Sequence, residues 1–158
     1  MQNRFIVALI GALAIAGVVQ HGSAQSEDPT PDSNLFAYND AATVALGADL
    51  YVDFCAACHG ADLQGQENWQ TRQANGRLPA PPHDVTGHTW HHPDAQLFQI
   101  VKFGTAALVG NGYESDMIGY GDILTDDEIR AVMAYIKSTW PIQIIERHNA
   151  MNADVSGQ

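Results

Sequence analysis

Two cysteines and a histidine within one short segment are the residues of this chain best suited to chemistry. Cys55–His59 reads Cys-Ala-Ala-Cys-His, and Cys55 and Cys58 are the only cysteines in the sequence. On a helical turn, residues three and four positions apart share a face, so both thiols and the His59 imidazole point the same way. C-x-x-C-H is the attachment pattern of a c-type haem. We therefore predict one covalent haem c, tethered by Cys55 and Cys58, with His59 as an axial ligand of the iron.

Three other uses of this pattern were weighed against haem attachment. A thioredoxin-like dithiol is expected near a βαβ unit, but the residues before Cys55 have a helical pattern. A zinc site needs four ligands, and no second C-x-x-C motif supplies the rest. A disulfide between Cys55 and Cys58 would close a very short loop and stabilise little.

An iron bound by His59 has a second axial position to fill. A methionine there raises the reduction potential and favours electron transfer. Of the four methionines, Met1 is at the N-terminus, Met133 lies on an apolar helix face and Met151 lies in a polar tail. Met117, in the glycine-rich segment before the last predicted helix, is therefore the predicted second ligand. The alternative is that Met117 only packs within its loop.

The N-terminal residues have the composition of a secretory signal peptide. Met1–Arg4 is basic, Phe5–Val19 is apolar, and Gly22–Ala24 supplies small residues for cleavage. The apolar run is shorter than the roughly 20 residues of a transmembrane helix. We predict that residues 1–24 are a signal peptide and that the mature protein is periplasmic, without stable insertion in the membrane. An uncleaved signal that tethers the protein is the alternative.

The mature chain is strongly acidic. Removing residues 1–24 takes away Arg4 and no acidic residue, so the formal charge changes from −11 to −12. This charge argues against nucleic acid and anionic membranes as partners and favours a redox protein with a basic docking face. The alternative is that the surface acids only keep the protein soluble.

The pattern of apolar residues predicts an all-α protein without internal repeats. Residues 25–39 lack periodicity and are predicted to be a flexible N-terminal arm. A first helix is predicted from Asn39 or Asp40, either of which can cap it, to Cys55. Gly47 within this helix costs about 1 kcal/mol relative to Ala, so we expect another helix to approach it closely.

The last predicted helix has the clearest boundaries. Thr125 and Glu128 have the spacing of a capping box, and Trp140 precedes a proline, which ends a helix. A middle helix is predicted over Pro93–Phe103, with Pro93 at its first position and Gly104 just beyond its end.

The chain resembles a class I monohaem cytochrome c of the bacterial respiratory type. The resemblance rests on two segments, Leu50–Ala61 around the haem motif and Met117–Ile129, and covers about Ala42–Trp140. It implies a domain over residues 40–141, with three to five helices around one covalent haem, followed by a C-terminal extension over residues 142–158. It implies a one-electron carrier rather than an enzyme. One departure is Ile118, because a proline usually follows the ligand methionine in this family.

The resemblance also implies residues around the haem. Family members use a proline carbonyl to accept a hydrogen bond from the proximal imidazole, which here implies Pro81 or Pro82. Such a bond fixes the ring and raises its basicity. By the same analogy Arg77, Trp90 and Tyr120 are candidates for binding the haem propionates.

Four further histidines cluster after the proline segment, at His83, His88, His91 and His92. Imidazole suits copper and zinc, but the segment is interrupted by Gly87 and Pro93, so we expect hydrogen bonding near the haem edge rather than a second metal. They could also make the potential or docking depend on pH.

Two alternative functions follow from these residues. If Met117 is not a ligand, a five-coordinate haem sensor or peroxidase is expected. If the apolar residues Ile142–Ile145 contact another chain, the protein is an obligate haem subunit of a periplasmic oxidoreductase. The same residues could instead fold back onto the core.

Overall fold

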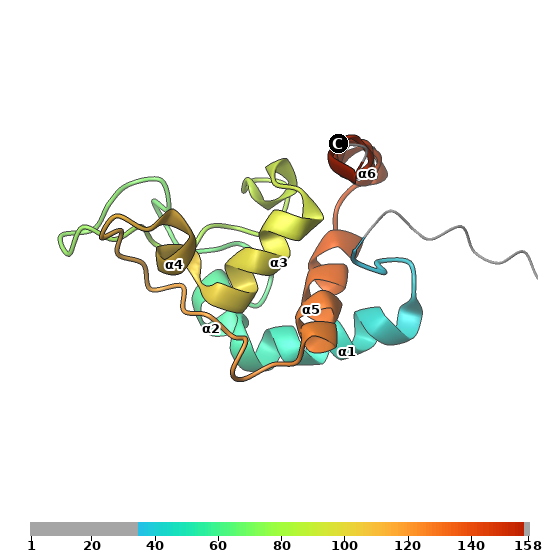
Figure 1. Cartoon of the computed structure of the whole chain (residues 1–158), viewed down its shortest axis with the longest axis horizontal. Helices are drawn as coiled ribbons and strands as arrows, with labels where there is room; N and C mark the ends of the chain where they lie inside the picture. Colours follow the sequence, from blue (N-terminus) through green and yellow to red (C-terminus); the bar gives the residue numbers. More distant parts are fainter. Residues whose placement is uncertain (1–34, 157–158) are drawn as a thin grey trace, which may run out of the picture. The chain divides into compact units, whose positions relative to one another are not determined.

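The computed structural model describes residues 35–156, and this part of the chain contains helices and no strand (Figure 1). The helices are α1 (Ala41–Phe54), α2 (Ala56–His59), α3 (Asp94–Phe103), α4 (Thr105–Val109), α5 (Asp126–Ser138) and α6 (Ile142–Ser156), with a 3-10 turn η1 (Thr89–His91). The predicted all-α class is confirmed. The described residues hold six helices: five lie within the predicted domain over residues 40–141, in agreement with the predicted three to five, and α6 follows that domain. The predicted signal peptide and residues 25–34 lie outside the described residues.

Helices α1 and α5 begin where their capping residues predict. The Asp40 side chain accepts a hydrogen bond from the Thr43 amide at 2.7 Å. At the start of α5, Thr125 Oγ1 accepts from the Glu128 amide at 3.3 Å, and Glu128 Oε2 accepts from the Thr125 amide at 2.8 Å. The capping box therefore satisfies two backbone donors that the helix itself cannot.

The two helices cross at a glycine, as predicted (Figure 1). A Cβ on Gly47 would lie 1.9 Å from the Ala131 carbonyl oxygen and 3.0 Å from Tyr135 Cβ. Beside this contact the rings of Tyr51 and Tyr135 lie 5.4 Å apart, centroid to centroid. The backbones of α1 and α5 therefore approach each other at a distance that a side chain at residue 47 would prevent.

The hydrophobic core is centred on α5. Some of the buried side chains of this core lie on the apolar face of α5, and the others pack against that face. Together they include Phe36, Tyr51, Leu97, Phe98, Leu124, Ile129, Val132, Met133, Ile136, Trp140 and Ile145. Helix α3 joins this core through Leu97 and Phe98. Pro93 is the residue before α3 rather than its first residue, and Gly104 ends the helix with a φ of 81°.

The C-terminal extension forms a helix that the sequence analysis did not predict. In α6, Ile145, His148 and Asn152 lie at helical spacing on one face and are buried. The apolar end of the extension therefore folds back onto the rest of the chain. Two of the three residues on this buried face are polar, so no apolar periodicity marks the helix in the sequence.

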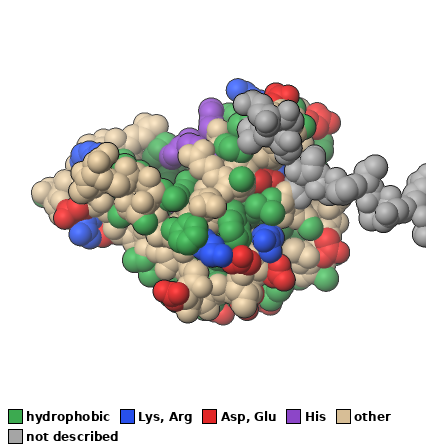
Figure 2. All heavy atoms as spheres, viewed as in Figure 1, with side chains coloured by type: hydrophobic (Ala, Val, Ile, Leu, Met, Phe, Trp, Pro, Cys, Tyr) green, Lys and Arg blue, Asp and Glu red, His purple; other side chains and the backbone are tan. Residues whose placement is uncertain are grey.

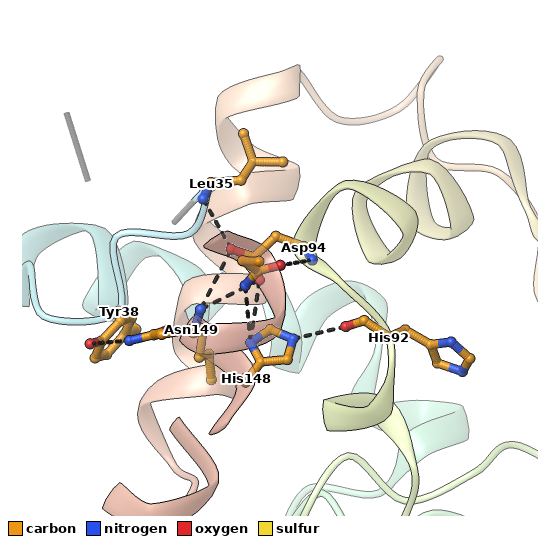
Figure 3. A network of polar contacts seen from close by, with 8 residues as sticks. Leu35, Tyr38, His92, Asp94, His148 and Asn149 are labelled. Atoms are coloured by element: carbon orange, nitrogen blue, oxygen red, sulfur yellow. Dashed lines mark hydrogen bonds and ion pairs between the residues drawn. The ribbon is translucent and has the colours of Figure 1, made fainter. Parts of the chain in front are cut away.

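A buried polar network attaches α6 to α3 and α5 (Figure 3). Asn152 Oδ1 accepts a hydrogen bond from the Asp94 amide at 2.8 Å, at the start of α3. His148 Nε2 donates to the His92 carbonyl at 2.8 Å. The Asp94 carboxylate lies 3.4 Å from Lys137 Nζ and 3.5 Å from His148 Nδ1. Because buried charges are costly unless paired, this network fixes where α6 lies.

The end of the predicted flexible arm also contacts the core. Phe36 is fully buried, and the Leu35 amide donates to the Asp94 carboxylate at 3.0 Å (Figure 3). Residues 35–39 are therefore anchored to the core, whereas they were predicted to be part of a flexible arm. Among the described residues, no helix has the length and apolar character needed to cross a membrane.

Candidate haem site

The three residues of the C-x-x-C-H motif lie at the junction of α1 and α2. The His59 amide donates to the Cys55 carbonyl at 2.9 Å, which gives this segment the helical turn that the motif requires. Gly60, with a φ of 80°, then ends the turn. Cys55 is half-buried and Cys58 is exposed, and neither forms a disulfide. Both thiols are therefore available for covalent attachment.

The environment of Cys55 does not suit a redox dithiol. Burial, reinforced by Cys58, raises the pKa of the Cys55 thiol to about 11. A reactive thiolate needs a lowered pKa and an electropositive environment. Cys55 is therefore a protonated thiol at neutral pH, and the structure offers no support for the thioredoxin-like alternative.

The His59 ring is buried and held by one backbone carbonyl. His59 Nδ1 lies 2.8 Å from the Pro81 oxygen. Since a carbonyl only accepts, Nδ1 carries the proton and Nε2 remains for a metal. The pKa of His59 is lowered by burial, against which the Pro81 bond acts. Of the two prolines considered, Pro81 has this geometry, whereas the Pro82 oxygen accepts from Thr89 Oγ1 at 3.4 Å.

Backbone contacts hold the proline segment beside the haem motif. The Gly65 amide donates to the His59 carbonyl at 2.7 Å, and the His83 amide donates to the Leu63 carbonyl at 2.7 Å. A Cβ on Gly65 would lie 2.4 Å from the Pro82 nitrogen. Main-chain packing therefore contributes to the position of the Pro81 carbonyl, together with the Gln66 side chain, whose Oε1 accepts from the Ala80 amide at 2.9 Å.

His83 is a residue of the site whose position the sequence did not indicate. Its ring stacks on that of His59 at 4.0 Å between centroids, with an interplanar angle of 25°. His83 Nδ1 lies 2.8 Å from Thr89 Oγ1, and Trp140 Nε1 donates to the His83 carbonyl at 2.8 Å. Burial, and to a smaller extent the neighbouring His59, lowers the pKa of His83. A neutral imidazole is therefore packed against the proximal ring.

The other predicted histidines lie apart from His59. His88 stacks on Trp69, with ring centroids 5.2 Å apart, and its edge faces His92 at 5.4 Å. Figure 2 shows histidine side chains gathered at one place on the face in view. Within residues 35–156, no three His, Cys, Asp or Glu side chains are arranged to hold a metal ion.

The segment that carries Met117 is packed closely against the end of α3. Met117 is half-buried, and its carbonyl accepts from the Thr105 amide at 3.3 Å. The Tyr120 amide donates to the Val101 carbonyl at 2.9 Å. A Cβ on Gly119 would lie 2.7 Å from the Phe103 carbonyl carbon. These main-chain contacts fix the segment, although residue 118 is an exposed isoleucine rather than a proline.

The three candidates for binding propionates have different partners. Arg77 forms ion pairs with Asp116 and Glu114. The Tyr120 hydroxyl donates to the Phe54 carbonyl at 2.9 Å. Trp90 Nε1 is buried and has no hydrogen-bond partner among residues 35–156. Of the three, Trp90 therefore has a buried donor that the described part of the chain leaves unsatisfied.

These residues fit a covalently bound haem. Leaving a buried donor without a partner costs about 1–3 kcal/mol, and a haem carboxylate would supply an acceptor for Trp90. The two free thiols would supply the covalent attachment, and the Nδ1-protonated imidazole would supply a ligand for the iron. Phe54 and Tyr120, in edge contact at 6.3 Å between centroids, add aromatic surface next to the motif.

Comparison with known proteins identifies related sequences for most of the described chain. The family model described as Cytochrome c matches residues 44–140. A protein named Nitrite reductase, from Stutzerimonas stutzeri, is 29% identical over 96 residues, which cover 57% of this chain and 15% of that protein. The present chain thus corresponds to a small part of that relative. No solved structure gives a significant match.

Proposed function

The chain belongs to the cytochrome c family, and from this premise we propose that it is a periplasmic one-electron carrier. In this proposal it holds one covalent haem c through Cys55 and Cys58, with His59 and Met117 as the axial ligands of the iron. When bound, the haem supplies the one-electron iron couple, and the polypeptide supplies attachment, orientation and electrostatics.

The observation that carries the proposal is the way in which the two predicted ligands are held. His59 is fixed by the 2.8 Å bond to Pro81, which leaves Nε2 available. Met117 lies in a segment bound to α3 by main-chain hydrogen bonds and by close contact at Gly119. Ligands held in this way would change little between the oxidised and reduced states, which suits electron transfer.

Each residue then has a separate role. Cys55 and Cys58 tether the haem, and the Pro81 carbonyl holds the proton on His59 Nδ1 and increases the basicity of that ring. Met117 would be the second protein ligand of the iron, which would raise the potential and leave no open position for external ligands. Trp90 Nε1 would donate a hydrogen bond to a propionate.

Location and partners are inferred from charge and from the N-terminal composition. The basic start, apolar run and small residues of Met1–Ala24 support export to the periplasm. A mature charge of −12 supports a redox partner with a basic docking face.

A second candidate function is favoured by the similarity to part of a larger protein. The matching relative is named as a nitrite reductase, and the similar region is 15% of its length. The present chain could accordingly be the haem subunit of an oxidoreductase complex. In size-exclusion chromatography of a native extract, followed by haem absorbance, a carrier elutes at the mass of one chain and a subunit elutes with its complex.

The experiment that tests the proposed function compares absorption spectra of the purified mature holoprotein, oxidised and reduced. We expect a low-spin c-type spectrum with a weak sulfur-to-iron charge-transfer band, which Met117→Ala abolishes. Met133→Leu is the matched control, because Met133 is buried in the core, and this variant should keep the band. A wild-type haem that is high-spin or readily binds carbon monoxide would instead indicate a sensor or peroxidase.

A further inference from the structure

Helix α6 places the positive charge of Arg147 beside Trp90, which is one of the candidates for binding a haem propionate. Trp90 is in η1, and α6 contacts this turn. Trp90, His91, Arg147 and Met151 line a small open cavity of about 80 Å³. The Arg147 guanidinium carbon lies 5.5 Å from the centroid of the Trp90 ring. An arginine and an unsatisfied tryptophan donor are therefore neighbours.

Arg147 forms no ion pair with an acidic side chain of the described residues, although the protein is rich in acids. Arg77, Lys102, Arg130 and Lys137 each form an ion pair with an aspartate. Within residues 35–156, the structure joins Arg147 to no carboxylate or carbonyl, and its recorded contact is with the Trp90 ring. Its charge is available to a ligand beside Trp90.

A carboxylate matches this pair of donors best. Guanidinium groups bind carboxylates strongly, and an indole N–H is a donor only. We propose that Arg147 and Trp90 together bind a haem propionate, so that α6 sets the reduction potential of the haem. This inference rests on the proposed function. Arg147 lies outside the matched span of residues 44–140, so this contact is a feature that the extension adds.

The expected effect on potential follows from charge. Oxidised haem iron carries one more positive charge than reduced iron, so a nearby guanidinium disfavours the oxidised state and raises the potential. Removing Arg147 should therefore lower the midpoint potential. We expect a threefold to tenfold change in the equilibrium constant, which for one electron is about 30–59 mV.

The test measures midpoint potentials of the full holoprotein and its variants by spectroscopic redox titration. Arg147→Gln should lower the potential, and Arg147→Lys should restore part of it. Arg130→Gln is the matched control, because it removes the same charge from an arginine that is 5.1 Å from the Phe98 ring and paired with Asp127. This control should shift the potential by less than a third of the Arg147→Gln effect.

A double-mutant cycle tests whether Arg147 and Trp90 share one ligand. Trp90→Phe removes the indole donor and keeps an aromatic ring under the guanidinium. If both groups bind one propionate, the shifts of Trp90→Phe and Arg147→Gln should be non-additive. Equal shifts for Arg147→Gln and Arg130→Gln, or additive shifts in the cycle, would overturn the inference.

Failure of the inference can be distinguished from failure of the proposed function. The wild-type spectrum reports the ligation of the iron before any variant is compared. A low-spin spectrum with the sulfur-to-iron band, together with an unchanged potential in Arg147→Gln, would reject the inference alone. Arg147 is exposed, so the variant should keep the wild-type unfolding temperature.

Discussion

At the scale of single residues, main-chain atoms position the chemical groups of this site. The His59 ring is held by the Pro81 carbonyl, and the Met117 segment is held by amide and carbonyl groups of residues 101–105. Proline suits the first role because its own nitrogen cannot donate and its carbonyl here belongs to no helix. Glycine suits the second because it lets two backbones touch.

If main-chain contacts position Met117, a small change at Gly119 should disturb it. In Gly119→Ala the new Cβ would lie 2.7 Å from the Phe103 carbonyl carbon, so the segment must move. We expect a weaker sulfur-to-iron band. We also expect the Kd of added imidazole to fall at least about tenfold, which is about 1.4 kcal/mol in binding free energy. Imidazole titration of the oxidised holoprotein measures this effect.

Gly112→Ala is the control for this prediction. Gly112 lies in the same loop at a φ of 75°, and a Cβ there would meet nothing within 4 Å. The control should cost backbone strain of about 1 kcal/mol and leave imidazole binding unchanged. Equal imidazole affinities for the two variants would show that contact at Gly119 does not hold Met117.

At the scale of elements, the crossing of α1 and α5 is the contact on which the core depends. In Gly47→Ala the Cβ would meet the Ala131 carbonyl oxygen at 1.9 Å, and neither backbone can yield without separating the helices. Alanine gains up to about 1 kcal/mol in helix propensity, but overpacking costs typically 1–3 kcal/mol or more. We expect a net loss of about 1–2 kcal/mol in the free energy of unfolding.

Denaturant unfolding of the holoprotein checks this value. Asp49→Ala, at an exposed position of the same helix, is the control and should change stability by less than about 0.5 kcal/mol. A Gly47→Ala variant as stable as wild type would mean that the crossing tolerates a wider spacing.

Helix α6 makes stability depend on pH through His148. His148 Nε2 donates to the His92 carbonyl, and Nδ1 lies 3.4 Å from Asn152 Nδ2, an arrangement that suits the neutral ring. Burial, with a contribution from Lys137, lowers the pKa of His148 below its usual 6.5, against the effects of the His92 bond and Asp94. The unfolded chain therefore takes up a proton first as pH falls.

Stability should decrease as pH falls below about 6.5, by up to about 1.4 kcal/mol per pH unit from this group. His148→Gln keeps a donor for the His92 carbonyl and should show a smaller decrease between pH 7.5 and 5.5. Thr125→Ala is the control, because loss of the cap costs about 1 kcal/mol but should not change how stability depends on pH. Thermal unfolding at the two pH values makes the comparison, and identical slopes for wild type and His148→Gln would contradict it.

At the scale of the whole molecule, net charge governs encounters with partners. We expect the formal charge of −11 to attract a basic redox protein over a distance set by the Debye length, about 8 Å at physiological ionic strength. We expect the bimolecular rate of electron transfer to a basic partner to fall at least tenfold between low and high salt. Stopped-flow measurements with one basic and one acidic redox protein test this, since the acidic partner should show the opposite trend.

The sequence by itself determined the features that depend on neighbouring residues. The turn of Cys55–His59, the cap at Thr125 and the end of α3 at Gly104 were all predicted, because each is set within a few positions of the chain. The cap of α1 was narrowed to Asn39 or Asp40, and the structure selects Asp40. The close approach at Gly47 was also predicted, since a glycine inside a strong helix pattern indicates a neighbouring backbone.

Only the tertiary structure decided the contacts between distant segments. His83 stacks on His59, Arg77 pairs with Asp116 and His148 binds the His92 carbonyl, across separations of 24 to 56 residues. Helix α6 was not predicted, because two of its three buried residues are polar and their partners lie at His92 and at the start of α3. Burial and pairing of this kind depend on where the chain returns in space, which local patterns do not encode.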